Sequence, residues 1–405
     1  MANVAILGYG TVGSGVYEVI KTNQDIVNKN AGKELNIKYV LDLRDFPGDP
    51  VEEVLVHDFE IIVNDPEVDI VVEVMGGLEP AYTFVKKCLL AGKSVCTSNK
   101  ELVAKKGPEL IQIAREKNIN FLFEASVGGG IPIIRPLNTS LTADKITEIT
   151  GILNGTTNYI LTQMRDEGWD FDKALKTAQD LGFAERNPEA DIEGFDACRK
   201  IAILASLSLG SYVDFEDIYT EGISKVTARD IQYAAKLGRA IKLLASAKIE
   251  DDKVYAFVSP FMIPASHPLY SVNGVFNAIF ANGNCLGDVM FYGSGAGKLP
   301  TASAVVSDVV DAAKHLGDNM TINWNNEKVA ITSVENFTRA FFVRVSGNKA
   351  ERIDEIEKAY GPVTVVELEG VTDEFGFVTE PMQEKKFQEV YESTEGALGR
   401  IRLEK

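Results

Sequence analysis

An aspartate and a lysine at the start of a long apolar stretch are the residues best suited to chemistry. Asp196 and Lys200 lie four positions apart, so a helix places them on one face. Apolar residues occur on almost every face from Phe195 to Leu209, which predicts a buried helix. On an exposed helix the pair would be an ordinary ion pair, but a desolvated lysine is costly unless it has a function. We therefore interpret the pair as part of a site in which Asp196 keeps the Lys200 amine protonated.

The N-terminus predicts a nucleotide-binding loop between a strand and a helix. An apolar strand at 3–7 leads into a glycine-rich loop and then into a helix with Val16, Val19 and Ile20 on one stripe. Glycines allow a tight turn and a close approach of the backbone to a pyrophosphate, which the helix N-terminus favours. In this setting the pattern is the dinucleotide-binding fingerprint, and its residues are Gly8, Tyr9, Gly10, Thr11, Val12 and Gly13.

Two residues at the end of the second strand favour different forms of the adenine ribose of such a cofactor. The strand at 37–41 ends at Asp42, where a carboxylate would bind the ribose hydroxyls. Arg44 follows two residues later and would instead meet a 2′-phosphate. The gap from the glycines exceeds the usual about 20 residues, which a lengthened helix and loop at 23–33 explains. The sequence leaves the choice between NAD and NADP open.

The first third of the chain continues with alternating strands and helices, which is typical of a parallel sheet. The sequence predicts strands at 69–74, 94–97 and 120–124, and helices at 82–90 and 109–116. Ligands of such sheets gather at the carboxyl ends of the strands, where Lys100 and Glu124 both stand. Spacing alone does not separate a functional Lys100 from a solvated loop lysine.

From about residue 135 the pattern changes. The stretch 146–153 alternates as a half-buried strand and ends in 154–158, whose amides and hydroxyls normally only cap a helix. Further strands are expected at 255–260 and 284–292, and a helix at 301–315. The glycine-rich loop 293–297 is a weak phosphate-loop signal, since no strand–helix–strand unit surrounds it.

The segment after Glu335 predicts a separate module. Its expected elements are strands at 339–345, 363–368, 375–379 and 398–403, with helices at 350–360 and 383–393. This β-α-β-β-α-β order is the ferredoxin-like split unit. We therefore expect an α/β chain with a Rossmann-type dinucleotide-binding domain at 1–132, completed by a helix at 300–318, an α+β catalytic and dimerisation domain at 133–299, and a ferredoxin-like domain at 336–405.

Composition narrows the class of protein. A chain of 405 residues is long enough for two or three domains, and its net charge of -18 argues against binding nucleic acid or an anionic membrane surface. The scattered cysteines and histidines make a zinc site or a disulfide framework unexpected and fit a reducing cytoplasm; they are Cys88, Cys96, Cys198, Cys285, His57, His267 and His315. The N-terminus begins directly with a strand, without a basic leader or a long apolar span.

With these motifs in place, the chain resembles homoserine dehydrogenase from residue 1 to about 330. The resemblance rests on G-Y-G-T-V-G at 8–13, S-N-K at 98–100, E-A-S-V-G-G-G-I-P at 124–132, G-I-L-N-G-T-T-N-Y-I-L at 151–161, E-x-x-P-x-x-D-x-E-G-x-D-x-x-x-K at 185–200 and G-S-G-A-G-K-L-P-T-A-S-A-V at 293–305. It implies an NAD(P)-dependent enzyme that interconverts L-aspartate 4-semialdehyde and L-homoserine, on the route to threonine and methionine. The segment after residue 335 is similar to an ACT domain, an amino-acid sensor that many members carry.

The resemblance also implies roles for individual residues. Lys200 would donate the proton to the aldehyde oxygen, and Lys100 would be a second lysine touching cofactor and substrate. The substrate's ammonium would be held by Glu185 and Asp196 with support from Asp191, and Gly155 and Thr156 would also contact the substrate. The cofactor would contact the fingerprint residues Gly8, Gly10, Thr11, Val12 and Gly13, and also Asp42, Arg44, Met75, Gly76, Ser98, Lys100 and Gly297. A monovalent cation, Na+ or K+, would be held by Glu124 and the backbone carbonyls of Val127, Gly129 and Ile131. Asn187 departs from the family, in which aspartate often precedes the proline, so the contacts of this acidic loop are open.

The residues agree with that chemistry on physical grounds. Aldehyde reduction needs a hydride at carbon and a proton at oxygen, so an acid must stand beside the nicotinamide. Carboxylates complement the substrate's α-ammonium. Two alternatives remain: a cofactor-bound sensor without catalysis, which the joint presence of both lysines and the acidic residues disfavours, and an amino-acid dehydrogenase that acts at the α-carbon and releases ammonia. A cysteine-dependent enzyme would need an activated thiol, and none has obvious help.

Assembly and regulation are the last expectations. Strands after residue 135 would leave apolar edges and faces exposed in a monomer, which predicts a homodimer or homotetramer. ACT domains that bind amino acids usually place an aspartate and a glycine between their first strand and first helix. Here the loop is Val345-Ser346-Gly347-Asn348-Lys349-Ala350, without aspartate or proline. Whether the module senses L-threonine or only pairs subunits is therefore open.

Overall fold

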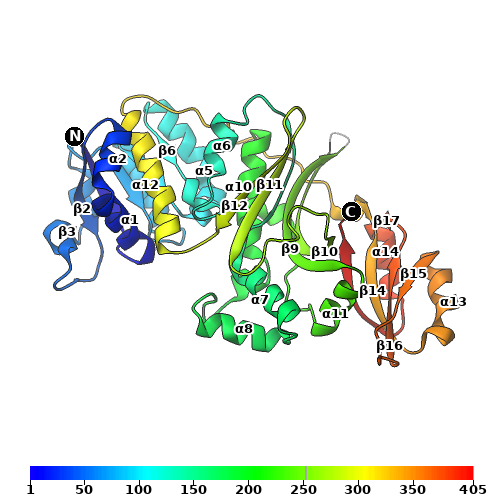
Figure 1. The fold of residues 1–405 in the computed structure, drawn as a ribbon. Coiled ribbons are helices and arrows are strands. Elements are labelled where there is room, and N and C mark those ends of the chain that lie inside the picture. The colour runs from blue at the N-terminus through cyan, green and yellow to red at the C-terminus, as the bar shows by residue number, and fades with distance from the viewer. Residues whose placement is uncertain (251–252, 405) are drawn as a thin grey trace. The chain divides into compact units, whose positions relative to one another are not determined.

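The computed structural model describes residues 1–250 and 253–404. These residues form two compact units (Figure 1). The nucleotide unit comprises Met1–Ile146, Ala202–Glu216 and Asn282–Val329, and the substrate unit comprises Thr147–Ile201, Asp217–Ala281 and Ala330–Lys405.

A parallel six-stranded sheet organises the nucleotide unit. Its order is β3-β2-β1-β4-β5-β6, with β1 (Ala2–Leu7), β2 (Leu35–Leu41), β3 (Leu55–Val56), β4 (Ile70–Glu73), β5 (Ser94–Thr97) and β6 (Phe121–Leu122). Strands β1 and β4 are almost wholly buried, because helices cover a parallel sheet on both faces. The strand order reverses between β1 and β4, and such a switch point opens a crevice at the carboxyl ends of the strands. The predicted Rossmann-type domain is confirmed.

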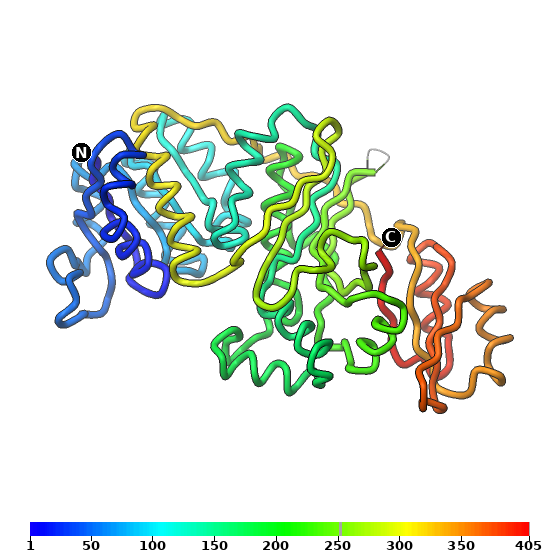
Figure 2. The backbone as a smooth tube through the Cα atoms, viewed as in Figure 1, coloured from blue at the N-terminus to red at the C-terminus, as the bar shows by residue number. Residues whose placement is uncertain are grey.

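The helices of this unit come from distant parts of the sequence. They are α1 (Thr11–Thr22), α2 (Gln24–Ala31), α3 (Phe59–Val63), α4 (Ala81–Leu90), α5 (Lys100–Glu116), α6 (Ile134–Thr139) and α12 (Lys298–Lys314), with 3-10 turns η1 (Pro50–Val54) and η2 (Glu124–Ser126). Figure 2 shows α12 returning beside α1 at the N-terminal end of the chain. A Cβ at Gly15 of α1 would lie 3.0 Å from the Ala302 side chain, so glycine allows this close helix packing.

Three predicted boundaries in this unit are wrong. Helix α5 begins at Lys100 rather than at residue 109, because the Asn99 side chain caps it by accepting the Leu102 N–H at 3.1 Å, and Pro108 is accommodated inside the helix. The strand predicted at 120–124 is shortened to Phe121–Leu122, since Glu124 begins a 3-10 turn. Strand β12 (Gly287–Ser294) begins three residues later than predicted.

A mixed sheet runs through the substrate unit in the order β11-β7-β9-β10-β18-β14-β16-β15. The first members are β7 (Ile146–Ile152), β9 (Arg239–Glu250), β10 (Lys253–Pro264) and β11 (Phe276–Gly283), and β8 (Tyr219–Thr220) pairs with β10. The helices are α7 (Gly155–Asp166), α8 (Phe171–Asp180), α9 (Glu189–Ile192), α10 (Phe195–Leu209) and α11 (Ala228–Lys236), with the turn η3 (Phe215–Asp217). Helix α10 begins where the sequence predicted, and its residues 195–201 belong to this unit.

The C-terminal module has the predicted β-α-β-β-α-β order. It consists of β14 (Phe341–Ser346), α13 (Lys349–Tyr360), β15 (Val363–Val366), β16 (Glu374–Thr379), α14 (Glu384–Glu392) and β18 (Ala397–Leu403), preceded by η4 (Val334–Asn336), and β13 (Thr338–Arg339) pairs with β17 (Met382–Gln383). An aromatic core around Phe341, Phe377 and Phe387 holds it together. Strand β18 also pairs in parallel with β10, so the module extends the sheet of the substrate unit. Searching the described residues finds no helix with the length and apolar character needed to cross a membrane.

Candidate active site

The ammonium of Lys200 is buried and paired at the start of α10. Its Nζ donates to Oδ2 of Asp196 at 2.7 Å and to the backbone carbonyl of Leu153 at 2.8 Å. Lys200 is 9% exposed and Asp196 is 3% exposed. Removal from water destabilises a lysine's charge, and an adjacent carboxylate offsets that cost. The predicted Asp196–Lys200 pair is therefore present, with the charge of the buried lysine compensated by an adjacent carboxylate.

Asn154 connects this pair to the acidic loop, a role that the sequence did not indicate. Its Oδ1 accepts the Thr157 N–H at 2.9 Å and so caps α7, as its position predicts. Its Nδ2 donates to Asp191 at 2.7 Å and to Asp196 at 2.9 Å. In the sequence, Asn154 is visible only as a polar residue at the end of a buried strand. Helix capping is a sufficient explanation for such a residue, so the sequence offered no reason to expect the contacts with the two aspartates.

The three other predicted substrate contacts, Gly155, Thr156 and Glu185, have different surroundings in the structure. Gly155 permits a close approach, since a Cβ there would lie 2.7 Å from the backbone carbonyl of Val275. The Thr156 hydroxyl donates to the carbonyl of Phe183 at 2.6 Å and so anchors the segment that leads into the acidic loop. Glu185 is exposed on that segment, while Asp191 of α9 is half-buried and joined to Asn154. The structure thus brings Asp191, Asp196 and Lys200 together and leaves Glu185 at the surface.

The glycine-rich loop leaves room for a pyrophosphate. A Cβ at Gly13 would lie 1.9 Å from the Gly8 carbonyl oxygen, and Gly8 has a φ of +99°, so neither position tolerates a side chain. A Cβ at Gly10 would meet no atom within 4 Å. A cavity of about 570 Å³ adjoins this loop and is lined by Gly8, Gly10, Leu41, Asp42, Leu43, Arg44, His57, Phe59, Val74, Met75, Pro80 and Phe84. The residues present therefore fit a dinucleotide.

Asp42 and Arg44 form a two-pronged ion pair in this cavity. Arg44 donates from Nε to Oδ1 and from Nη2 to Oδ2 of Asp42, each at 2.9 Å. The backbone N–H of Tyr9 donates to the same carboxylate at 2.8 Å. The hydrogen bonds from Arg44 hold the pKa of Asp42 well below its ordinary value, although partial burial opposes them. The side chain of Arg44 is 62% exposed, so it retains a face toward solvent.

The other predicted cofactor contacts follow the ends of buried strands. Met75 and Gly76 follow β4, where their N–H groups donate to the buried carboxylate of Glu73 at 2.8 and 3.4 Å. Ser98 follows β5, and Lys100 is the first residue of α5. Thr11 and Val12 begin α1, and Gly297 precedes α12 with a φ of +125°. All of these positions belong to the nucleotide unit.

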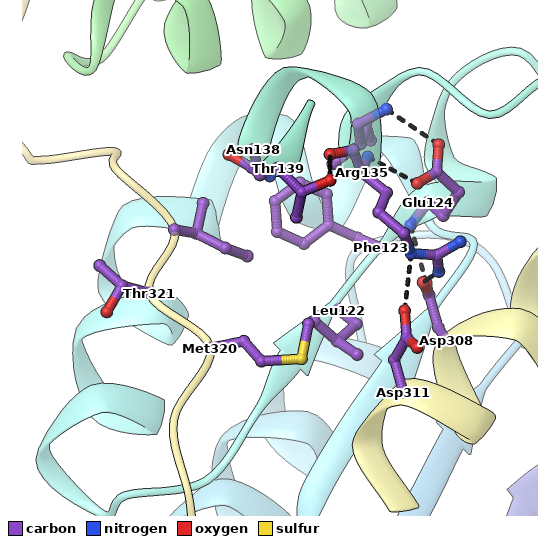
Figure 3. A pocket seen from close by; sticks show the side chains of 12 residues that line it. Leu122, Phe123, Glu124, Arg135, Asn138, Thr139, Asp308, Asp311, Met320 and Thr321 are labelled. Carbon is purple, nitrogen blue, oxygen red and sulfur yellow. Dashed lines mark hydrogen bonds and ion pairs between the residues drawn. The ribbon is translucent and has the colours of Figure 1, made fainter. Parts of the chain in front are cut away.

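The carboxylate of Glu124 is hydrogen-bonded to backbone amides. Its two carboxylate oxygens accept N–H groups of Ile133 at 2.6 Å and Ile134 at 2.9 Å. They also accept the Arg135 N–H at 2.7 Å (Figure 3). Within residues 1–250 and 253–404, no three His, Cys, Asp or Glu side chains are grouped to hold a metal ion. Val127 and Ile131, which follow Glu124 in the sequence, are buried. A Cβ at Gly129 would lie 2.5 Å from the Gly295 carbonyl oxygen, so glycine is needed there for the close approach of the two backbones.

An ion-pair cluster next to Glu124 was also not predicted from the sequence. Arg135 pairs with Asp308 at 2.8 Å and Asp311 at 2.7 Å, and Asp308 accepts the Glu124 N–H at 2.8 Å (Figure 3). Burial, with the nearby charge of Glu124, raises the pKa of Asp308 to about 8. The cluster ties α6 to α12, which are far apart in the sequence and have no shared motif.

Comparison with known proteins gives one family. The family model for homoserine dehydrogenase matches residues 132–310, and that for the homoserine dehydrogenase NAD-binding domain matches residues 8–124. A homoserine dehydrogenase from Bacillus subtilis is 44% identical over 79% of this chain and 75% of its own length. One from Synechocystis is 48% identical over 76% of this chain and 72% of its own length.

Solved structures agree over a wider range. A homoserine dehydrogenase from Thiobacillus denitrificans superposes with a TM-score of 0.90 and 36% identity, covering 100% of this chain and 98% of its own. A hyperthermophilic archaeal homoserine dehydrogenase in complex with NADPH gives a TM-score of 0.66 and 33% identity, over 77% of this chain and 97% of its own. With its dinucleotide loop, its buried lysine–aspartate pair and these relatives, the chain belongs to the homoserine dehydrogenase family.

Proposed function

We propose that Lys200 is the general acid of this homoserine dehydrogenase. In the direction of aldehyde reduction it donates a proton to the carbonyl oxygen, and in homoserine oxidation the same amine accepts the hydroxyl proton. The observation that carries this proposal is the 2.7 Å bond from Lys200 to Asp196, since a buried amine needs such a partner to stay protonated. The nicotinamide cofactor, when bound, supplies or accepts the hydride.

Asp191 and Asp196 are proposed to hold the substrate's α-ammonium. Both carboxylates accept a hydrogen bond from the Asn154 amide, Asp191 at 2.7 Å and Asp196 at 2.9 Å. Two carboxylates at this position complement the positive charge of an ammonium group. Glu185, which is exposed on the acidic loop, is proposed to contact the same ammonium. Lys100 is proposed, on the resemblance, to contact cofactor and substrate.

The cofactor is proposed to be either NAD or NADP without a strong preference. Asp42 is ionised and suited to the ribose hydroxyls, while Arg44 keeps an exposed face that suits a 2′-phosphate. A cation is proposed to use the backbone carbonyls of residues 124, 127, 129 and 131. The Glu124 carboxylate would not be a ligand, because backbone amides already occupy it.

The C-terminal module is proposed to serve assembly and positioning rather than L-threonine sensing at its first loop. The guanidinium of Arg352 fills that loop, donating to the carbonyls of Ser346 at 2.7 Å and Glu395 at 2.8 Å. A Cβ at Gly347 would lie 2.9 Å from the same side chain. We also propose a homodimer or homotetramer in the cytoplasm, and buried unpaired cysteines such as Cys88 and Cys96 fit that compartment.

The reaction is tested by following NAD(P)+ reduction with L-homoserine and assaying ammonia in the same samples. The proposal expects cofactor reduction without ammonia release. Ammonia formed in proportion to reduced cofactor would identify an amino-acid dehydrogenase instead. No reduction with either cofactor, in protein that binds NADPH, would identify a sensor without catalysis.

A further inference from the structure

An arginine of the C-terminal module is bonded to the substrate-binding part of its unit. Arg402 lies on β18 and is 2% exposed. Its Nε donates to Glu384 of α14 at 3.0 Å, and its Nη1 donates to Ser259 of β10 at 2.6 Å. Nη1 also donates to Glu221, which follows β8, at 2.5 Å. The guanidinium therefore joins a carboxylate of the module to one outside it.

Glu221 is held as an anion by this contact. Burial alone would raise the pKa of its carboxyl, but the charges of Arg402 and Arg400 outweigh burial and keep the pKa below its ordinary value. The Tyr219 hydroxyl donates to the same oxygen at 2.9 Å. The backbone N–H of Glu221 donates to the Val258 carbonyl at 2.8 Å, so the backbone as well as the side chain is anchored.

The residues after Glu221 are in direct contact with the acidic loop, residues 185–194. A Cβ at Gly222 would lie 2.1 Å from the Ile192 carbonyl oxygen and 2.4 Å from Cα of Glu193, so no side chain fits between the two backbones. The Ile223 N–H donates to the Ile192 carbonyl at 2.7 Å. Displacement of the segment 221–223 must therefore displace Ile192 and Glu193.

The same loop carries the proposed substrate contacts. Asp191 immediately precedes Ile192, and its backbone carbonyl accepts the Gly194 N–H at 3.0 Å. Gly194 also lies against β8 and β10, where its Cβ would meet Thr220 and Val258 side chains at 3.2 and 3.1 Å. Helix α10, with Asp196, begins at the next residue. The loop 191–194 is thus enclosed by backbone that Glu221 anchors.

We propose that Arg402 is a positioning residue for the reaction, which sets the loop 191–194 for L-homoserine through the segment 221–223. It touches neither substrate nor cofactor. Its guanidinium fixes the Glu221 carboxylate, and the close backbone contact at Gly222 transmits that position to Ile192 and hence to Asp191. The C-terminal module thereby contributes to substrate affinity without a bound effector. This inference rests on the proposed role of Asp191 and Asp196 in holding the ammonium.

A second buried ion pair provides a matched control. Arg344 of β14 donates to Asp230 of α11 at 2.7 Å, and the two residues are 6% and 3% exposed. This pair also joins the module to the rest of the substrate unit. Asp230 belongs to the capping box of α11 with Thr227, a helix outside the acidic loop. Substitution of Arg344 therefore removes a comparable bond from a residue whose hydrogen bonds to Asp230 and Thr227 do not involve the segment 221–223.

The test compares Arg402→Gln and Arg402→Lys with Arg344→Gln in steady-state assays at varied L-homoserine and varied NADP+. For Arg402→Gln we expect KM for L-homoserine to rise about 10-fold or more, within the about 10²-fold that a misplacement of about 1 Å can cost. NADPH affinity, measured by fluorescence titration, should stay within about 2-fold, because the nucleotide loop is untouched. Arg402→Lys should recover part of the loss, since an ammonium still pairs with Glu221. Arg344→Gln should lower the melting temperature but leave both constants near wild type.

Several outcomes would overturn the inference. A wild-type KM for L-homoserine in Arg402→Gln would do so, and so would an equal rise in Arg344→Gln. If Arg402→Gln does not fold, Glu221→Gln and Arg402→Lys replace it, and unchanged KM values in both would exclude the role. All these variants retain Lys200, so a normal KM in them leaves the acid–base proposal intact. Failure of that proposal shows instead as turnover in Lys200→Ala.

Discussion

The Lys200 ammonium donates a hydrogen bond to the backbone carbonyl of Leu153 at 2.8 Å. Leu153 follows β7 directly, so the sheet of the substrate unit orients the amine from one side while Asp196 orients it from α10. These two acceptors hold the flexible lysine side chain in one position and so define where it can deliver its proton. A general acid depends on such positioning.

Loss of this amine should remove proton transfer and little else. We expect Lys200→Ala to lower kcat by at least about 10²-fold, as loss of a general acid does. NADPH binding, followed by fluorescence, should be unchanged. Near-normal turnover in the variant would refute the assignment.

A single variant can distinguish the two roles of Asn154, which caps α7 and also bridges Asp191 and Asp196. Asn154→Ser keeps a good N-cap for α7 but removes the amide donor to Asp191 and Asp196. We expect kcat/KM for L-homoserine to fall about 10-fold or more, because two carboxylates lose a shared donor of about 1 kcal/mol or more. Melting temperature should change little. A large loss of stability with normal kcat/KM would mean that capping is the residue's main role.

Cofactor choice should depend on Arg44. Wild-type enzyme should use NADH and NADPH with kcat/KM values within about 10³ of each other, a difference of roughly 4 kcal/mol. Arg44→Ala should lower kcat/KM for NADPH about 10-fold or more, the value of a charge-assisted hydrogen bond to phosphate, and leave that for NADH nearly unchanged. Equal losses with both cofactors would show that Arg44 acts only by holding Asp42.

The protein should be at least a dimer in solution. Strand β12 presents Met290 and Tyr292 outward, 44% and 52% exposed, and Leu286 just before it is 48% exposed. A row of exposed apolar side chains on a strand is typical of a covered face. Light scattering at micromolar concentration should give twice the chain mass or more. A monomer would contradict the expectation, and Tyr292→Asp should shift a dimer toward monomer if this strand lies in the interface.

L-Threonine should not act through the first loop of the C-terminal module. Arg352 occupies that loop through two backbone carbonyls. Activity and melting temperature should be unchanged up to about 10 mM L-threonine, a generous ceiling for a millimolar site. Inhibition that disappears on truncation after Glu335 would instead make the module a sensor.

The sequence by itself determined the nucleotide loop, the buried helix and its ion pair. Glycines at 8, 10 and 13 allow few other local structures between a strand and a helix, and an i,i+4 pair shares a face whatever surrounds it. The β-α-β-β-α-β order of the C-terminal module was likewise readable, because alternation and helical periodicity are local properties.

Only the tertiary structure decided what each side chain meets. Asn154 was predicted as a cap and is also a bridge, because the contacts with Asp191 and Asp196 depend on how α7, α9 and α10 converge. Glu124 stays a predicted member of a cation site, and only the structure shows that its carboxylate accepts backbone amides of residues 133–135. The pairing of β18 with β10, which places Arg402 beside Glu221, joins strands about 140 residues apart. Contacts of such long range follow from the packing of whole elements, and no local pattern records them.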